Sequence, residues 1–325
     1  MVNKKLIIGS SIILIIGFGI VFAFSSKNKT VSKQEKIVES FECGFPNKNE
    51  VKAVIYSNGD LKFEGKGDVQ QYAHGEHPWQ SSKNKITSVS FGEKITPVNM
   101  DYWFENMKDL KYIGKLPSSV QSVVGMCANC PEIEAGADWK ECTQLNDISK
   151  VYFNCKKINE IPSIPENVIN ATYAFAGCAN LEQTPDMEKA DKLVNGIGMY
   201  SGCIELKQSS SAPNLELMDR MYESCEKLEE MPELSDKVLS LGQAFMNCIN
   251  MTKASPIPKS AENITECFLG CSALKDTLTI NSNPKEYADF LKDAATKNKL
   301  KIDGTSTIKD ELQKTSNNKN VIIEN

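Results

Sequence analysis

The feature that most constrains the fold is an internal repeat of about 23 residues. Of its eight copies, seven begin with an aromatic residue, seven have a cysteine three positions later, and all eight have Leu, Ile or Met three positions after that. The eight phrases are FENMKDL, CANCPEI, YFNCKKI, FAGCANL, YSGCIEL, YESCEKL, FMNCINM and FLGCSAL. Gaps of 23, 25, 23, 25, 22, 23 and 23 residues separate their central positions, which are Met107, Cys130, Cys155, Cys178, Cys203, Cys225, Cys248 and Cys271.

The spacing inside each unit predicts one short helix and one short strand. Apolar groups at i, i+3 and i+6 form one stripe of a helix. After the leucine, segments such as Ile158–Ile161 end at a proline, which keeps its predecessor extended. A unit of this size cannot bury its apolar face alone, so neighbours must stack. We therefore predict an α/β solenoid, a leucine-rich-repeat array of short parallel strands and short helices, with an irregular helical bundle as the alternative.

The repeat also predicts the buried core. Cys127 takes the aromatic position of its phrase, whereas Cys142 lies midway between two centres and has no place in this register. Free cysteine behaves as a small buried hydrophobe, so we predict unbridged thiols rather than a column of disulfides. The predicted core residues are Phe104, Cys130, Cys155, Phe175, Cys178, Tyr200, Cys203, Tyr222, Cys225, Phe245, Cys248, Phe268 and Cys271.

Residues 1–24 are predicted to be a transmembrane anchor or a signal peptide. Lys4 and Lys5 precede Leu6–Phe24, a run of nineteen residues without a charge. About 20 apolar residues cross a bilayer as a helix, but cleavage after Ala23 is also possible. The lysines on the two sides of this run do not fix its orientation. We expect a single-pass protein of the cell membrane with extracytoplasmic repeats, or a secreted protein if the signal is cleaved.

The remaining chain divides into four predicted parts. Residues 25–40 form a polar stalk, 41–100 a β-rich N-terminal capping module, 101–276 the repeats, and 277–325 a small α/β C-terminal cap. In the first module, Asn58-Gly59 predicts a two-residue hairpin turn. The expected strands are Val51–Tyr56, Leu61–Glu64, Ile86–Phe91, Thr277–Ile280, Leu300–Ile302 and Val321–Glu324, and the expected helix is Pro284–Thr296.

The chain resembles the BspA-like leucine-rich-repeat surface proteins of bacteria. Ala174-Phe175-Ala176-Gly177-Cys178 matches the repeat phrase of that family, and Asp276–Ala294 is similar to its closing module. The segment before the repeats carries further matches at Asn58, Gly59, Leu61, Gly65, Gly67, Pro78, Trp79, Ile86 and Val89. The resemblance covers roughly Val51 to Ile302 and implies surface display with protein binding or adhesion. Because no Leu-Pro-x-Thr-Gly sorting signal is present, attachment would depend on the N-terminal segment.

Composition and motifs favour no enzyme, no cofactor and no metal. The net charge of −5 argues against nucleic acid as a partner. His74 and His77 are the only histidines, which leaves little room for a nucleophilic constellation. With Glu76 they are close enough to suggest a metal, but a plain loop is the favoured interpretation. The CxxC pair Cys127/Cys130 lacks a second ligand pair and already fits the repeat.

The repeat surface is the remaining candidate site. Residues that follow the inward leucine should point outward, and solenoids often bind partners through such a row; a merely solvated face is the alternative. We predict a cell-surface protein that binds a protein partner or a host-surface ligand, with a structural envelope accessory as the second possibility. The candidate residues are Asn159, Glu160, Glu182, Gln183, Lys207, Gln208, Glu229, Glu230, Thr252 and Lys253.

Overall fold

A computed structural model describes residues 35–210, 212–315 and 318–323. Residues 35–325 form one compact unit. The predicted anchor Leu6–Phe24 and residues 25–34 of the predicted stalk lie outside the described residues. Within those residues, every helix is too short or too polar to cross a membrane.

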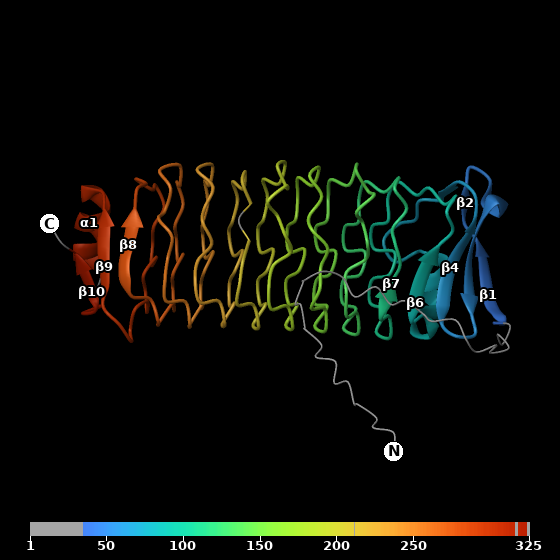
Figure 1. Ribbon diagram of the computed structural model, residues 1–325, viewed down its shortest axis with the longest axis horizontal. Coiled ribbons are helices and arrows are strands. Elements are labelled where there is room, and N and C mark those ends of the chain that lie inside the picture. Colours follow the sequence, from blue (N-terminus) through green and yellow to red (C-terminus); the bar gives the residue numbers. More distant parts are fainter. Residues whose placement is uncertain (1–34, 211, 316–317, 324–325) are drawn as a thin grey trace, which may run out of the picture. The chain divides into compact units, whose positions relative to one another are not determined.

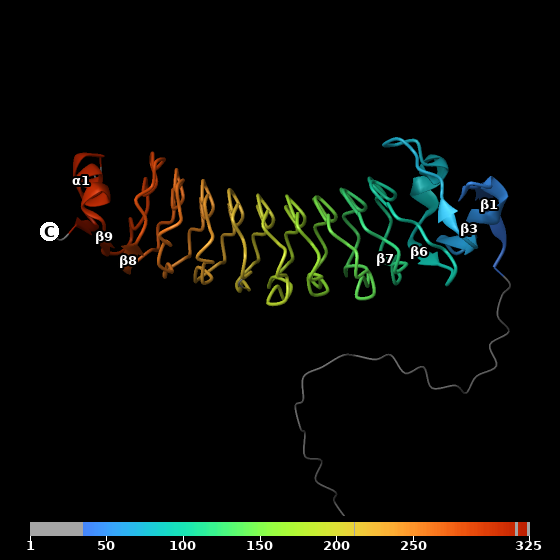
Figure 2. The same cartoon turned by 90° about the horizontal axis from the view of Figure 1, so that it is seen from above.

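The repeats wind into coils stacked one after another, as the ribbon shows from both directions (Figures 1 and 2). One-residue parallel bridges join each coil to the next, and their spacing follows the gaps of the sequence repeat. The predicted stacking with parallel pairing is therefore confirmed. The bridging residues form one continuous row of Asn99, Ser122, Asp147, Asn170, Asn195, Leu217, Ser240, Asn263 and Glu286.

The predicted short helix of each repeat is wrong. The aromatic–x–x–Cys segments are successive turns in which every second N–H donates to the next coil, for example Cys127 N to Val151 O at 2.9 Å. The intervening N–H groups close turns within their own coil, as Ala128 N does with Gly125 O at 3.1 Å.

The backbone explains why no helix forms there. The residue before each central position has a positive φ, which a right-handed helix cannot accommodate. Glycine and asparagine adopt this conformation most readily. They occupy seven of the eight positions, which are Asn106, Asn129, Asn154, Gly177, Gly202, Ser224, Asn247 and Gly270.

The N-terminal part is rich in strands. A five-stranded sheet has the order β1-β3-β4-β6-β7, with β1, β3 and β4 antiparallel and β4, β6 and β7 parallel. Its strands are β1 (Ile37–Glu42), β3 (Val51–Tyr56), β4 (Asp60–Gly65), β6 (Ser88–Phe91) and β7 (Tyr112–Ile113). The other elements are β2 (Gly44–Phe45), β5 (Asp68–Val69), and the 3-10 helices η1 (Lys48–Glu50) and η2 (Pro78–Lys85).

Two details of this part differ from the expectation. β1 pairs with β3, so residues 37–40 belong to the sheet and not to a stalk. The hairpin of β3 and β4 is confirmed, but the loop between the strands comprises Ser57, Asn58 and Gly59. Only Gly59 has a positive φ, at 89°, so the predicted two-residue turn is wrong.

The coils continue past the predicted boundary at residue 276. The predicted helix Pro284–Thr296 is wrong, because these residues form a further coil: Ile264 N donates to Glu286 O at 2.8 Å and Phe268 N to Phe290 O at 2.9 Å. Ala294, 23 residues after Cys271, takes the central position.

The predicted strands before and after this coil are present. They are β8 (Asp276–Ile280), β9 (Leu300–Gly304) and β10 (Val321–Ile323), which pair in parallel. α1 (Ser306–Thr315) was not predicted. The role of the two terminal modules as caps stays a prediction.

His77 lies buried in the aromatic cluster of the N-terminal part. Its ring centroid is 5.2 Å from that of Trp79 and 5.5 Å from that of Tyr72, and only 3% of the residue is exposed. Its Nδ1 has no hydrogen-bond partner among the described residues. Burial, and secondarily the charge of His74, lower the pKa of His77 to about 4.

This burial predicts a loss of stability in acid. The unfolded chain binds a proton on His77 near pH 6.5, whereas the folded chain does so only near pH 4. Stability is therefore complete above pH 6.5 and falls by about 3 kcal/mol as the pH drops to 4. Urea denaturation of His77→Leu at pH 7, 5.5 and 4.5 should show a weaker pH dependence than wild type. His74→Gln is the matched control, and equal slopes for all three proteins would contradict the expectation.

Candidate functional site

The core that positions the repeat surface is a column of stacked aromatic rings. Adjacent ring centroids are 5.4–6.3 Å apart with interplanar angles of 11–18°. The column consists of Tyr152, Phe175, Tyr200, Tyr222, Phe245 and Phe268. All thirteen predicted core residues are at most 1% exposed.

Two of the three tyrosines in this column, Tyr152 and Tyr200, direct their hydroxyls toward groups of the longer coils. Tyr152 Oη accepts a hydrogen bond from Ala137 N at 2.6 Å, and Tyr200 Oη contacts Met187 Sδ at 3.5 Å. Both partners lie in 25-residue coils. A buried polar group needs a partner, so the hydroxyl of Tyr152 satisfies a backbone N–H that the wider coil leaves inside.

The cysteines form a ladder of thiol hydrogen bonds. Each Sγ donates to the backbone carbonyl of the residue at the aromatic position of the preceding coil, as Cys178 does with Tyr152 O at 3.3 Å. Seven such contacts measure 3.0–3.3 Å. Burial raises the pKa of Cys203 to about 12, so the thiol keeps the proton it donates. Cysteine is thus both a small apolar residue and a donor.

The eleven cysteines are buried and free, which predicts their reactivity. Because reaction with iodoacetamide requires an accessible thiolate, native protein should remain unmodified. Denaturation without reductant should make all the thiols reactive. Mass spectrometry after each treatment checks this result, and linked neighbours such as Cys178 and Cys203 would contradict it.

Two of the four cysteines outside the regular ladder, Cys127 and Cys142, form backbone contacts between coils. Cys127 fills the aromatic position, and its carbonyl accepts from Cys155 Sγ at 3.0 Å. Cys142 donates to Pro117 O at 3.3 Å. It lies in an extra turn, Trp139–Leu145, that corresponds to Met187–Leu193 in the other 25-residue coil. The gap of 25 residues between central positions, instead of 22 or 23, marks the coils with this extra turn, and sequence reasoning did not use it.

The suspected histidine cluster does not converge. His74 Nε2 lies 2.5 Å from Glu105 Oε2, and its ring stacks on Tyr102 at 4.1 Å. His77 packs instead against Trp79. Among the residues that the structure describes, no group of three or more His, Cys, Asp or Glu side chains could hold a metal ion.

The candidate partner-binding residues lie on one surface, hereafter the strand face. Nine of the ten are exposed, and Thr252 is half-buried. Ion pairs join neighbouring coils there, at 2.9 Å between Lys207 Nζ and Glu182 Oε2 and 3.4 Å between Lys253 Nζ and Glu230 Oε2. The hydrogen bond from Lys207 holds the pKa of Glu182 below its usual value.

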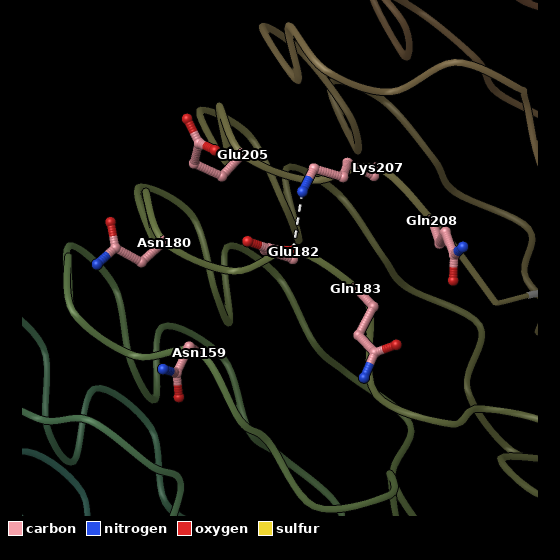
Figure 3. Close-up of a pocket in the computed structure, with 7 residues that line it drawn as sticks. All are labelled: Asn159, Asn180, Glu182, Gln183, Glu205, Lys207 and Gln208. Atoms are coloured by element: carbon pink, nitrogen blue, oxygen red, sulfur yellow. Dashed lines mark hydrogen bonds and ion pairs between the residues drawn. The ribbon is translucent and has the colours of Figure 1, made fainter.

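An open depression of about 620 Å³ spans three successive coils of the strand face (Figure 3). Five of the predicted residues line it, namely Asn159, Glu182, Gln183, Lys207 and Gln208. Asn180 and Glu205 complete the lining and were not predicted. Each of these two directly precedes an inward leucine, whereas sequence reasoning considered only residues after the leucine.

A known repeat family matches most of the chain. The family model described as "BspA type Leucine rich repeat region (6 copies)" matches residues 80–207 and 196–318. The chain belongs to this family. The resemblance inferred from the repeat phrases is thereby confirmed, and BspA-type repeats are generally protein-interaction repeats. No curated protein matches the chain.

Three solved structures are similar to this BspA-type chain. A leucine-rich repeat protein from Bacteroides ovatus has 12% identity and a TM-score of 0.30, with 89% of this chain and 100% of that chain covered. One from Eubacterium ventriosum has 13% identity and a TM-score of 0.28, covering 73% and 89%. A leucine rich cell surface protein from Faecalibacterium prausnitzii has 14% identity and a TM-score of 0.24, covering 79% and 94%. The family assignment rests on the family model.

Proposed function

We propose that this protein is a surface-displayed interaction module that binds a protein partner through the strand face. The observation that carries the proposal is the depression formed by side chains of three successive coils, at positions where solenoids commonly bind. Membership of a family of interaction repeats supports it. The residues proposed to contact the partner are the ten strand-face residues together with Asn180 and Glu205.

The proposal includes a location outside the cytoplasm. Leu6–Phe24 would anchor the chain in the cell membrane, or the chain would be secreted after cleavage at Ala23. Protease added to intact cells should then digest the repeats of the anchored form. Digestion only after lysis would place the repeats in the cytoplasm and contradict surface display.

Partner binding is tested by capture on the purified full-length protein. The combined variant Glu182→Ala, Gln183→Ala, Lys207→Ala and Gln208→Ala should lose a partner that wild type retains from envelope extracts or host surfaces. The control is Glu188→Ala with Lys189→Ala, which changes exposed residues in a turn of one of the same coils. Self-association alone would favour the alternative, a structural accessory of the envelope.

A further inference from the structure

The backbone pairing along the strand face is interrupted at more than one seam, and one of these interruptions lies beside the depression. Between the coils centred on Cys130 and Cys155, Asn159 N donates to Glu134 O at 3.1 Å and Gly136 N to Glu160 O at 2.8 Å. Between the coils centred on Cys178 and Cys203, the equivalent bonds are Lys207 N to Glu182 O at 2.9 Å and Thr184 N to Gln208 O at 3.1 Å. We call these the paired seams.

The seam between the coils centred on Cys155 and Cys178 differs from these two, and we call it the open seam. The seam between the coils centred on Cys203 and Cys225 lacks the same two bonds within the described residues, from Glu229 N to Lys207 O and from Ser209 N to Glu230 O, but Glu229 and Glu230 do not line the depression. By register, Glu182 N should donate to Asn159 O, and Ile161 N to Gln183 O. Within the described residues neither bond forms. The continuous row on the other side of the same coils is intact, with bridges from Asp147 to Asn170 and from Asn170 to Asn195. The break is therefore confined to the strand face.

Among the described residues, the side chains and prolines at the open seam supply no contact that replaces the two missing bonds. Pro162 and Pro185 follow at the same register in the two coils, and proline has no N–H to donate. Glu160 and Glu182 place like charges on its two sides, whereas the paired seam beyond it has the Lys207–Glu182 ion pair. Two segments of the ladder thus keep unpaired N–H and C=O groups next to the depression.

The depression beside the open seam is lined by side-chain carboxamides and by charged side chains that already form ion pairs. Its charged side chains are already paired, Glu182 with Lys207 and Glu205 with Lys227. No side-chain hydrogen bond within the described structure engages its four carboxamides, which belong to Asn159, Asn180, Gln183 and Gln208. Figure 3 shows these carboxamides around the Glu182–Lys207 pair. Every carboxamide supplies both donors and an acceptor.

We propose that the open seam binds an extended, uncharged peptide segment of the partner through amide-to-amide hydrogen bonds. A peptide group, or an Asn or Gln side chain, has a carbonyl oxygen that can accept a hydrogen bond from Glu182 N–H. It also has an N–H that can donate to Asn159 C=O. The lining has no aromatic ring on which a nucleobase could stack. This inference rests on the proposed function and specifies the chemistry of its partner.

The test uses the full-length protein in detergent and fluorescein-labelled short peptides of alternating asparagine and threonine. Matched peptides replace asparagine with aspartate or lysine. Fluorescence anisotropy should give a Kd about tenfold lower for the asparagine peptide than for either charged peptide, since each amide pair contributes about 1 kcal/mol. Equal affinities, preference for a charged peptide, or absence of binding would each overturn the proposal.

Isosteric variants test the site itself. Asn159→Asp with Gln183→Glu removes amide donors without changing shape and should weaken binding of the asparagine peptide about tenfold. Gln121→Glu, an exposed amide on another coil, should leave it unchanged. Thermal melting confirms that each variant is folded, and unchanged binding by the double variant would overturn the proposal. A captured protein partner that depends on the strand face but not on these two amides would overturn the open-seam site while leaving the proposed function intact.

Discussion

Phe245→Ala should lower the free energy of unfolding by about 3–5 kcal/mol. The side chain is 0% exposed and lies between two rings of the aromatic column, 5.4 Å from Tyr222 and 5.8 Å from Phe268. Removing it leaves a cavity that the rigid stack of coils cannot close and breaks two ring contacts. Chemical denaturation followed by circular dichroism measures the loss.

The matched control is Leu239→Ala in the same stretch of chain. Leu239 is 41% exposed, so its truncation should change the free energy of unfolding by about 0.5 kcal/mol or less. Each coil is stabilised by its neighbours, so the damage at Phe245 should also broaden the transition. An equal decrease in the free energy of unfolding for the two variants would show that the aromatic column does not stabilise the core.

Gly198→Ala should destabilise the protein by about 1–3 kcal/mol more than Gly202→Ala. Both glycines have positive φ, 60° and 74°, so both substitutions carry a similar backbone strain. A Cβ on Gly198 would lie 2.2 Å from the ring of Tyr173 in the preceding coil, whereas the nearest atom at Gly202 is 3.8 Å away. The difference between the variants isolates the clash.

Removing the ring identifies the cause. In the double variant Tyr173→Ala with Gly198→Ala, the added alanine has no ring to meet, so the costs should be strongly non-additive. Denaturation midpoints of the four proteins in this cycle measure the coupling. Additive costs, or equal costs for Gly198→Ala and Gly202→Ala, would contradict the packing of Tyr173 over Gly198.

The stacking and the core could be predicted from the sequence, but the local backbone could not be derived from apolar spacing alone. Apolar residues at i, i+3 and i+6, as at Phe175, Cys178 and Leu181, suit a helix and a series of turns equally well. The deciding signal was the residue before each cysteine. This position is usually glycine or asparagine, as at Gly177 and Asn154, and these residue types adopt a positive φ most readily. Asp293 also has a positive φ but is neither glycine nor asparagine, and there the last coil was predicted as a helix.

The candidate site was predicted only in outline. Outward residues such as Glu182 and Gln208 follow from the direction of the inward leucine, and the structure places them around one depression. The open seam depends on which backbone groups of different coils meet. That pairing is set by contacts between segments about 23 residues apart, so the residues at the seam do not reveal it.

Site-specific photocrosslinking in intact cells tests partner binding at the strand face most directly. A benzophenone amino acid is placed at Gln183, which lines the depression, or at Lys189, an exposed residue in a turn of the same coil. Irradiation should attach a protein partner through Gln183 and none through Lys189. A partner attached through Lys189 alone, or equally through both positions, would contradict binding at the strand face.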